Sequence, residues 1–328
     1  MEPSEKIDIR YYRPGDATRI CALFTRYLPY QRDTEFWVWI NRLLGGGSIV
    51  SVAECGNQII GHYGIVPRDF IIDGVRYHAG LGIHAFVAPE FRNRVSIFEI
   101  SSLAYKEAKR IGLSFLYGFP NANYRYIQEK IEKWTCVSLF NAYELFLDAF
   151  NGSDNCDAVS LTKIDRMDCS LLYPLQMLIE NCPESLVAPV MDCRHWLLRY
   201  LMHPQHLYEL YEVKEREEMI GYVVMKKYRK EDKEYRHIVD YVFSEKTDLH
   251  RIIACIAGMA KEDHADCLSV WKGDSRFEKA LLDTGFEPTG FDTFLGIKLL
   301  GKALDKAVVG KLTDFSNWRL VMGDTDSF

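Results

Sequence analysis

The sequence lacks long apolar segments and paired cysteines. No apolar run approaches the ~20 residues that a membrane-spanning helix requires, and the N-terminal MEPSEKIDIR is charged where a signal peptide needs an apolar core. The 9 cysteines are odd in number, scattered, and never form a CxxC pair, so the pattern predicts neither a disulfide framework nor a zinc site. We therefore expect a cytoplasmic protein with no membrane partner and no metal.

Several common catalytic motifs are also missing. The sequence contains no GxGxxG, HExxH or GxSxG, which gives no support for hydride transfer, metal-dependent hydrolysis or a serine nucleophile. Positive charge is not in excess either, because 40 Lys and Arg face 46 Asp and Glu, for a net charge of -6. A protein that grips nucleic-acid phosphates is normally basic, so no nucleic-acid partner is expected.

The composition is that of a folded protein with more than one domain. Hydrophobic residues make up 48% and charged residues 26% of the 328 positions, and this length favours two domains. The polar, turn-rich segment 151–157 (NGSDNCD) places the boundary between residues 1–150 and residues 151–328. Oligomerisation stays open.

Both halves show the same order of predicted elements, β-α-α-β-β-β-α-β-α-β. Each half also has a hairpin whose second strand carries Ile-Gly, at Ile60-Gly61 and at Ile220-Gly221. An internal duplication explains this match, although two unrelated mixed domains can share an order by chance. The sequence thus predicts an α/β (α+β) protein in which each half has a mixed central sheet flanked by helices.

In the first half, a long strand from Tyr77 to Ala88 is expected to end at Pro89. Apolar residues spaced for one helical face then predict a helix from Ser96 to Ile111. Earlier in the chain, the RPGD segment provides Asp16 as a helix cap.

These segments resemble the GNAT superfamily of acyl-CoA-dependent N-acyltransferases. The resemblance rests on RPGD, on Ile60-Gly61, on HAFVAPEFR (84–92) and on YGFPN (117–121), the last being typical of a subgroup with two fused GNAT-like domains. In the second half, HWLLRYLMHP, MIGYVV, HIVDYVFS and LLDTGF are similar to the degenerate partner domain of that subgroup. The resemblance implies an acyltransferase domain over 1–150, a degenerate GNAT-like domain over 151–328, and acetyl-CoA as co-substrate.

The resemblance also locates the diphosphate loop of the co-substrate. In the family this loop reads Arg or Gln, two variable residues, Gly, one variable residue, and Gly or Ala, because a helix N-terminus with free N–H groups holds the diphosphate. Here the six positions contain no glycine, and they are Arg92, Asn93, Arg94, Val95, Ser96 and Ile97. Two arginines beside the phosphates and one serine hydroxyl are the donors that remain.

Further site residues follow from the resemblance. The acyl-pantetheine arm pairs with the strand backbone at Phe86, Val87 and Ala88. Acyl transfer to an amine needs a base and an acid, and His84 stands where many relatives place a carboxylate base. A tyrosine in the following helix is the acid of many relatives; the register of the family falls on a glutamine here, so Tyr124 and Tyr126 are the candidates, with Asn121 able to reach the thioester.

The sequence therefore predicts an N-acetyltransferase that acts on the primary amine of a small molecule, with an amino sugar as one option. Two alternatives stay open. The glycine-free loop also fits a GNAT-like binding or scaffolding protein without catalysis. A Fem-type aminoacyl transferase, which uses aminoacyl-tRNA, is a third reading, against which the negative net charge argues.

Overall fold

The computed structural model describes residues 5–28, 33–44, 47–151, 158–164, 174–178, 187–301 and 304–327. Contacts divide the chain into two compact units. The first comprises Met1–Phe70, Val75–Ser138 and Phe294–Thr313, and the second comprises Ile71–Gly74, Leu139–Thr293 and Asp314–Phe328. The expected boundary at residue 150 stays a prediction, because residues 152–157 of the polar junction lie outside the described residues.

The first unit is built on a mixed sheet with the strand order β1-β2-β3-β4-β5-β13. The pairs β1/β2, β2/β3 and β5/β13 are antiparallel, whereas β4 and β5 are parallel. Its strands and helices are β1 (Ile7–Tyr11), α1 (Asp16–Tyr27), α2 (Thr34–Val38), β2 (Ile49–Cys55), β3 (Gln58–Ile72), β4 (Val75–Val87), α3 (Ile97–Arg110), β5 (Phe115–Gly118), α4 (Ala122–Lys130) and α9 (Lys306–Thr313). A π-helical turn, Trp39–Leu44, continues α2.

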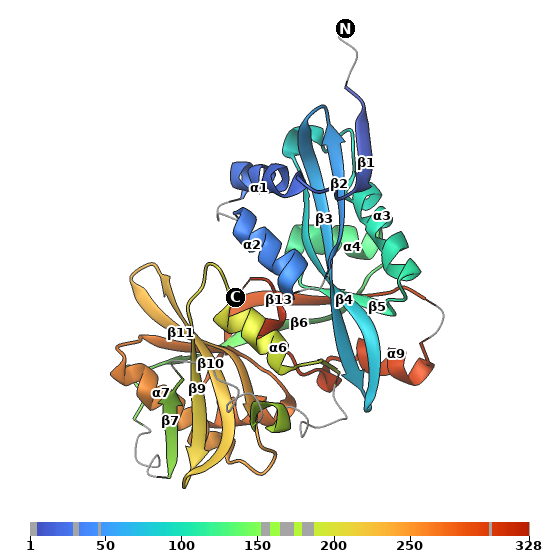
Figure 1. Cartoon of the computed structure of the whole chain (residues 1–328). Coiled ribbons are helices and arrows are strands. Elements are labelled where there is room, and N and C mark those ends of the chain that lie inside the picture. Colours follow the sequence, from blue (N-terminus) through green and yellow to red (C-terminus); the bar gives the residue numbers. More distant parts are fainter. Residues whose placement is uncertain are drawn as a thin grey trace. The chain divides into compact units, whose positions relative to one another are not determined.

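Helices cover both faces of this sheet, with α1 and α2 on one side and α3 on the other (Figure 1). Successive residues of a strand point to opposite faces, and β3 shows this directly. The ring of His62 packs edge-on against Phe24 of α1 at 5.2 Å, and the ring of Tyr63 packs against Tyr105 of α3 at 5.5 Å. We call these two sides the α1 face and the α3 face.

The packing of α3 depends on a glycine in β3. A Cβ atom at Gly61 would overlap Cδ1 of Ile100, so a larger residue would force the Ile100 side chain to move. Ile100, Ala104 and Ala108 form the buried stripe of the helix, as the apolar spacing predicted. The Ile60-Gly61 pair of the sequence is thus a packing feature.

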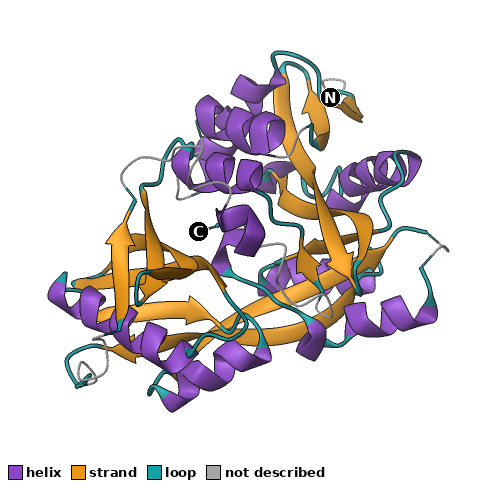
Figure 2. Ribbon diagram, turned by 60° about the horizontal axis from the view of Figure 1, so that its bottom comes forward, coloured by secondary structure: helices purple, strands orange, loops and turns teal. Residues whose placement is uncertain are grey.

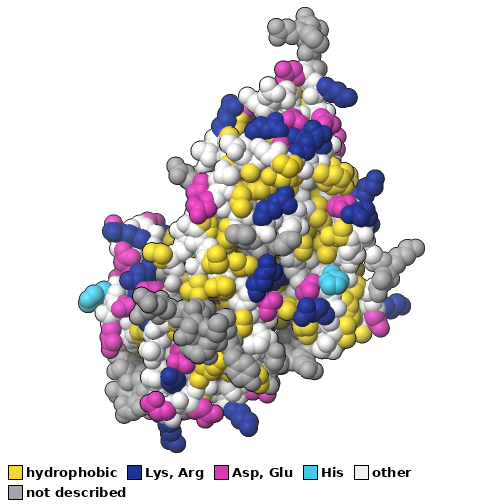
Figure 3. All heavy atoms as spheres, in the orientation of Figure 1, with side chains coloured by type: hydrophobic (Ala, Val, Ile, Leu, Met, Phe, Trp, Pro, Cys, Tyr) yellow, Lys and Arg dark blue, Asp and Glu magenta, His cyan; other side chains and the backbone are white. Residues whose placement is uncertain are grey.

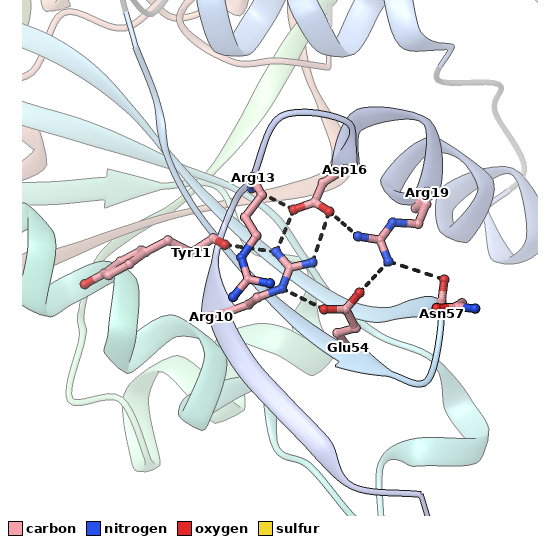
Figure 4. A network of polar contacts seen from close by, with 7 residues as sticks. All are labelled: Arg10, Tyr11, Arg13, Asp16, Arg19, Glu54 and Asn57. Carbon is pink, nitrogen blue, oxygen red and sulfur yellow. Dashed lines mark hydrogen bonds and ion pairs between the residues drawn. The ribbon is translucent and has the colours of Figure 1, made fainter.

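Helix α1 is anchored by an ion-pair network rather than by the predicted cap. Gly15, at φ 95, is the N-cap, and no side chain caps the helix, so the prediction for Asp16 as cap is wrong. Instead the Asp16 carboxylate accepts from Arg10, Arg19 and the backbone N–H of Arg13 (Figure 4). Glu54 on β2 closes the network by accepting from Arg10 and Arg19. A positive φ at position 15 requires glycine, and it turns the chain so that position 16 points into the sheet.

The second unit repeats this topology with the strand order β7-β9-β10-β11-β12-β6. Here β7/β9, β9/β10, β10/β11 and β12/β6 are antiparallel and β11/β12 is parallel. Its elements are β7 (Val159–Lys163), β8 (Ala188–Pro189), α6 (Cys193–Trp196), β9 (Tyr208–Glu215), β10 (Glu218–Lys230), β11 (Lys233–Phe243), α7 (Leu249–Glu262), β12 (Cys267–Trp271) and α8 (Ser275–Asp283). Helices again flank the strands (Figure 2), and the α/β prediction of a mixed sheet flanked by helices in each half is confirmed.

In each unit, one strand of the sheet comes from the other half of the sequence. Strand β6 (Thr135–Phe146) leaves the first unit and pairs with β12 through residues 142–146. Strand β13 (Glu287–Leu299) leaves the second unit and pairs with β5 through residues 296–299. The two β-strands are therefore exchanged, a feature that the repeated order of elements did not predict.

Candidate functional site

Strands β4 and β5 diverge after a short parallel contact. They pair at Ala79↔Phe115, Gly80↔Leu116 and Leu81↔Tyr117, and β4 then continues alone on that side to Val87. The backbone groups predicted to pair with the pantetheine arm differ in the hydrogen bonds that they already make. The N–H of Ala88 donates to Ile60 O of β3 at 2.8 Å, whereas the carbonyl of Val87 points the other way and accepts from Arg92 Nε at 3.1 Å. The backbone carbonyl of Val87, and not the N–H of Ala88, therefore faces the side on which β5 diverges. The ring of Phe86 packs against Tyr27 of α1.

His84 lies within β4 in a left-handed conformation, with φ 51. This conformation is uncommon for residues other than glycine, and strained backbone of this kind concentrates at functional sites. Its ring faces α1 and α2, at 5.4 Å from Phe24 and 6.3 Å from Phe36, and its carbonyl is 2.9 Å from Nδ1 of His62. His84 thus lies on the α1 face, next to the point where β4 leaves β5.

A buried carboxylate occupies the α3 face at the same level. Glu132, 1% exposed, accepts hydrogen bonds from Ser101 at 2.6 Å, from Tyr105 at 2.7 Å, and from Tyr124 at 3.2 Å to each oxygen. The hydroxyl of Tyr63 is 3.2 Å from that of Tyr105. Three hydroxyl groups thus donate to one carboxylate. We call these five residues the Glu132 cluster.

The Glu132 cluster lies beneath the divergence of the strands. A Cβ atom at Gly82, the first β4 residue after the pairing ends, would lie 2.8 Å from the hydroxyl of Tyr63. Burial is the main cause that raises the pKa of Tyr63, Tyr105 and Tyr124, and the negative charge of Glu132 adds to it. The three phenols therefore keep their protons at neutral pH and act as hydrogen-bond donors.

The two candidate tyrosines of α4 differ sharply. Tyr126 is 65% exposed, whereas the hydroxyl of Tyr124 belongs to the Glu132 cluster. Asn121 is the N-cap of α4, and its side chain accepts from the N–H of Tyr124 at 2.9 Å. The structure therefore brings Tyr124 to the divergence of the strands and leaves Tyr126 at the surface.

The loop after β4 is folded on itself. The N–H groups of Arg94 and Val95 both donate to the carbonyl of Phe91, at 2.9 and 3.0 Å. No residue from 92 to 97 has a positive φ. Val95 is buried, whereas the neighbouring Arg92, Asn93, Arg94 and Ser96 are exposed and Ile97 is partly buried.

A carboxylate of the chain already sits at the N-terminus of α3. Ser96 and Glu99 form a capping box, in which the Glu99 carboxylate accepts from Ser96 N at 2.7 Å and from Ser96 Oγ at 2.9 Å. A diphosphate would need these donors and would meet a like charge. The loop in this arrangement does not fit the diphosphate of CoA. The edge of β4 after Leu81 is not paired with β5, and this is where the resemblance places a pantetheine arm.

A separate pocket of about 210 Å³ opens on the α1 face near the end of β4. Residues of α1, β3 and the segment 88–91 line it. The lining also includes Arg19 and Asn57, whose contact within the ion-pair network is drawn in Figure 4. Arg26 and Glu90 on the rim form a long ion pair of 3.7 Å. These two charged groups therefore pair with each other.

The second unit has a counterpart of the divergence of β4 and β5, and a segment near the C-terminus lies next to it. Strands β11 and β12 pair from Tyr235↔Cys267 to Ile238↔Val270. Beyond that point Leu320 N donates to Gly273 O at 3.3 Å, and Arg319 donates to the carbonyl of Tyr241. Residues 319–320 near the C-terminus therefore contact β11 and the turn that follows β12.

Sequence reasoning missed the Glu132 cluster. Glu132 lies in the polar stretch EKIEKW, where a charged residue suggests a solvated surface, and Tyr63 and Tyr105 match ordinary core positions. Nothing in a single sequence brings these residues together. Among the residues that the structure describes there is no group of three or more side chains that could hold a metal, and no helix is long and apolar enough to cross a membrane.

Comparisons with known proteins relate this geometry to a family. The sequence profile of the acetyltransferase (GNAT) domain matches residues 8–129. No curated protein sequence matches the chain. Two similar solved structures are a GCN5-related N-acetyltransferase from Anabaena variabilis, with a TM-score of 0.68 at 12% identity, and a probable N-acyltransferase from Enterococcus faecalis, with 0.70 at 10%; each match covers 90% of this chain and 73% of the other.

A third structure has the two-domain layout. A tandem GNAT protein from the clavulanic acid biosynthesis pathway aligns with a TM-score of 0.60 at 11% identity, covering 91% of this chain and 100% of that protein. At these identities the likeness concerns the fold.

Proposed function

Residues 8–129 belong to the GNAT family of acetyltransferases, and from this premise we propose that the protein is an N-acyltransferase that moves an acetyl group from a pantetheine thioester to the primary amine of a small molecule. The observation that carries the proposal is the divergence of β4 from β5 after Leu81, with His84 on the α1 face and Tyr124 on the α3 face. An acyl group held between the strands would meet one titratable side chain from each face.

The two side chains suit the two proton transfers of the reaction. As the amine nitrogen bonds to the acyl carbon and the carbon–sulfur bond breaks, the nitrogen must lose a proton and the sulfur must gain one. His84 is proposed to accept the proton on the amine side, since an imidazole exchanges protons near neutral pH. Tyr124, protonated and held by Glu132 and Asn121, is proposed to hydrogen-bond the departing sulfur and to give it its proton, which the phenol regains from water.

A small-molecule acceptor agrees with the surface charge. Basic and acidic side chains are interspersed over the visible face (Figure 3), which is unlike the continuous basic surface of a protein that binds tRNA. Within this class an amino sugar stays one option for the acceptor. This argument favours a small amine over the Fem-type reaction.

The test is acetylation of a panel of primary amines, including amino sugars and their nucleotide-linked forms. The purified protein is incubated with S-acetyl-4′-phosphopantetheine or with acetyl-CoA at about 1 mM, the upper range of common KM values, and amides are detected by mass spectrometry. We expect at least one acetylated amine, which His84→Ala forms far more slowly. No amide with either thioester and any amine contradicts the proposal.

The loop after β4 favours one second candidate. Because Glu99 occupies the N-terminus of α3, the protein could bind a thioester or thiol without catalysing transfer. In that case calorimetric titration with the thioester would show binding, whereas neither the wild type nor His84→Ala would form an amide.

A further inference from the structure

The loop between β4 and α3 determines which acyl donor the chain can hold. A diphosphate bound at a helix N-terminus takes several backbone N–H groups and profits from the positive end of the helix. In this chain three consecutive N–H groups, those of Arg94, Val95 and Ser96, already donate to Phe91 O and to the Glu99 carboxylate. The donors left for a ligand are therefore few.

The charge at this end of α3 is already neutralised as well. Glu99 is the acidic residue of the first turn, and its carboxylate accepts both donors of Ser96. The carboxylate takes the position that an anion would otherwise fill. A second anion would be repelled, and the repulsion grows with the charge that the ligand places at this helix end.

The two arginines of the loop offer one phosphate position. Arg92 is anchored by its Nε to the carbonyl of Val87 at 3.1 Å, so its guanidinium stays beside the end of β4. Arg94 turns away, stacking on Phe91 at 5.7 Å and donating to the carbonyl of Glu5. One guanidinium at the end of the strand matches the single phosphate that terminates a phosphopantetheine arm.

We propose that the acyl donor of this protein is an acyl-4′-phosphopantetheine that lacks the 3′-phospho-ADP half of CoA, and that Glu99 is the residue that disfavours CoA. The inference rests on the proposed function, because it names the donor for the same opening between β4 and β5. The same chemistry occurs in two sources, a free phosphopantetheine thioester and the prosthetic group of an acyl carrier protein.

The first measurement is binding, which does not depend on turnover. Calorimetric titration compares 4′-phosphopantetheine with CoA on the wild-type protein. We expect phosphopantetheine to bind at least as tightly as CoA, although CoA has far more atoms to contact.

Glu99→Gln is the matched variant, because glutamine preserves the capping box and removes only the charge. We expect this variant to strengthen CoA binding about fivefold, the size of a helix-end charge effect, and phosphopantetheine binding less than about twofold. Unchanged thermal unfolding would show that the helix cap is intact.

Turnover with an amine that the wild type acetylates distinguishes the sources. A larger kcat/KM for an acetyl-loaded acyl carrier protein than for free S-acetyl-4′-phosphopantetheine identifies the carrier protein, and the reverse identifies the free thioester. Both results support the single-phosphate donor when acetyl-CoA is the poorer substrate.

Three different results would refute the donor, the role of Glu99, or the acyltransferase activity itself. Binding of CoA tenfold or more tighter than phosphopantetheine in the wild type refutes the donor and leaves the acyltransferase standing. Equal CoA affinity in wild type and Glu99→Gln refutes the role of Glu99. Absence of both binding and turnover with every thioester refutes the acyltransferase and the donor together.

Discussion

The hydroxyl of Tyr124 lies 3.2 Å from both carboxylate oxygens of Glu132. The two residues stand at opposite ends of α4, and Glu132 returns to Tyr124 because the chain turns sharply after the helix. Its N–H donates to Ile127 O at 3.1 Å, and the next residue, Lys133, has φ 60. A buried carboxylate thereby fixes the α4 tyrosine that faces the divergence of β4 and β5.

Tyr124→Phe is expected to lower kcat by about 10² or more with little change in donor affinity, because it removes a hydrogen bond to the departing sulfur. Tyr126→Phe, on the same helix but 65% exposed, should keep wild-type kinetics. Steady-state rates and donor titrations of both variants test this. Equal kcat for the two variants would show that Tyr124 serves only in packing.

His84→Ala is expected to reduce turnover by about 10² to 10⁴, the range for loss of a general base. The defect should shrink as pH rises, because more of the acceptor amine is then already deprotonated. A pH profile of kcat/KM from pH 6 to pH 10 measures it. A constant ratio of wild type to variant across that range would remove His84 from proton transfer.

Asp16→Asn is expected to destabilise the first unit by about 3 kcal/mol or more at neutral pH, since it leaves buried Arg10 without its main partner. Burial alone would raise the pKa of Asp16, but hydrogen bonds from Arg10, Arg13 and Arg19 lower it from 3.8 to about 2. Denaturant unfolding at a series of pH values measures the loss.

The sign of the pH effect follows from that lowered pKa. The native carboxylate binds its proton less readily than the unfolded one, so the ionised group stabilises the native state fully above pH 3.8, by roughly 2 kcal/mol, and this contribution disappears as pH falls to about 2. The difference between wild type and Asp16→Asn should narrow over that range. Asp8→Asn, on the exposed side of β1, is the control and should follow the wild type.

Three histidines of the second unit make its stability sensitive to acid at milder pH, and one of them is His203, whose pKa burial lowers from 6.5 to about 2. Burial is the main cause that lowers the pKa of His206 and of His237 from 6.5 to about 4, and the positive charge of Lys226 adds to it, together with Arg199 at His206. Below pH 6.5 the unfolded chain binds protons that the native state refuses. The free energy of unfolding should therefore fall as pH decreases from 6.5 to about 4.

The double variant His206→Gln, His237→Gln should flatten this decline, whatever its stability at pH 7. Urea unfolding between pH 7 and pH 4 gives the slope for wild type and variant. His264→Asn, at an exposed turn that tolerates asparagine, should retain the full slope. An unchanged slope in the double variant would assign the acid sensitivity to other groups.

The sequence predicted the elements well where local patterns determine them. The helix expected from Ser96 to Ile111 is α3, with Ser96 as its cap, and the strand expected from Tyr77 to Ala88 is most of β4. Asp16 was misassigned because a helix cap and a buried ion-pair acceptor look alike in sequence. The partner that distinguishes them is Arg10 of β1, which reaches Asp16 only because β1 and the start of α1 pack together in the fold.

The glycine-free loop was visible in the sequence, but its consequence was not. Missing glycines predict a loop without positive φ angles, which the structure confirms. That the capping-box carboxylate of Glu99 would take the place of the missing ligand contacts depends on side-chain geometry. The Glu132 cluster likewise depends on tertiary packing that joins β3, α3 and the turn after α4.

The exchange of β6 and β13 bears on how the protein is made. During synthesis from the N-terminus, the edge of β5 is translated long before its partner, residues 296–299 of β13. Until residues 296–299 have left the ribosome, the first unit keeps an unpaired strand edge, which is the kind of surface that promotes association between nascent chains. Truncations at the middle of the gene should consequently yield an insoluble first half, and co-expression of the missing second half should rescue its solubility.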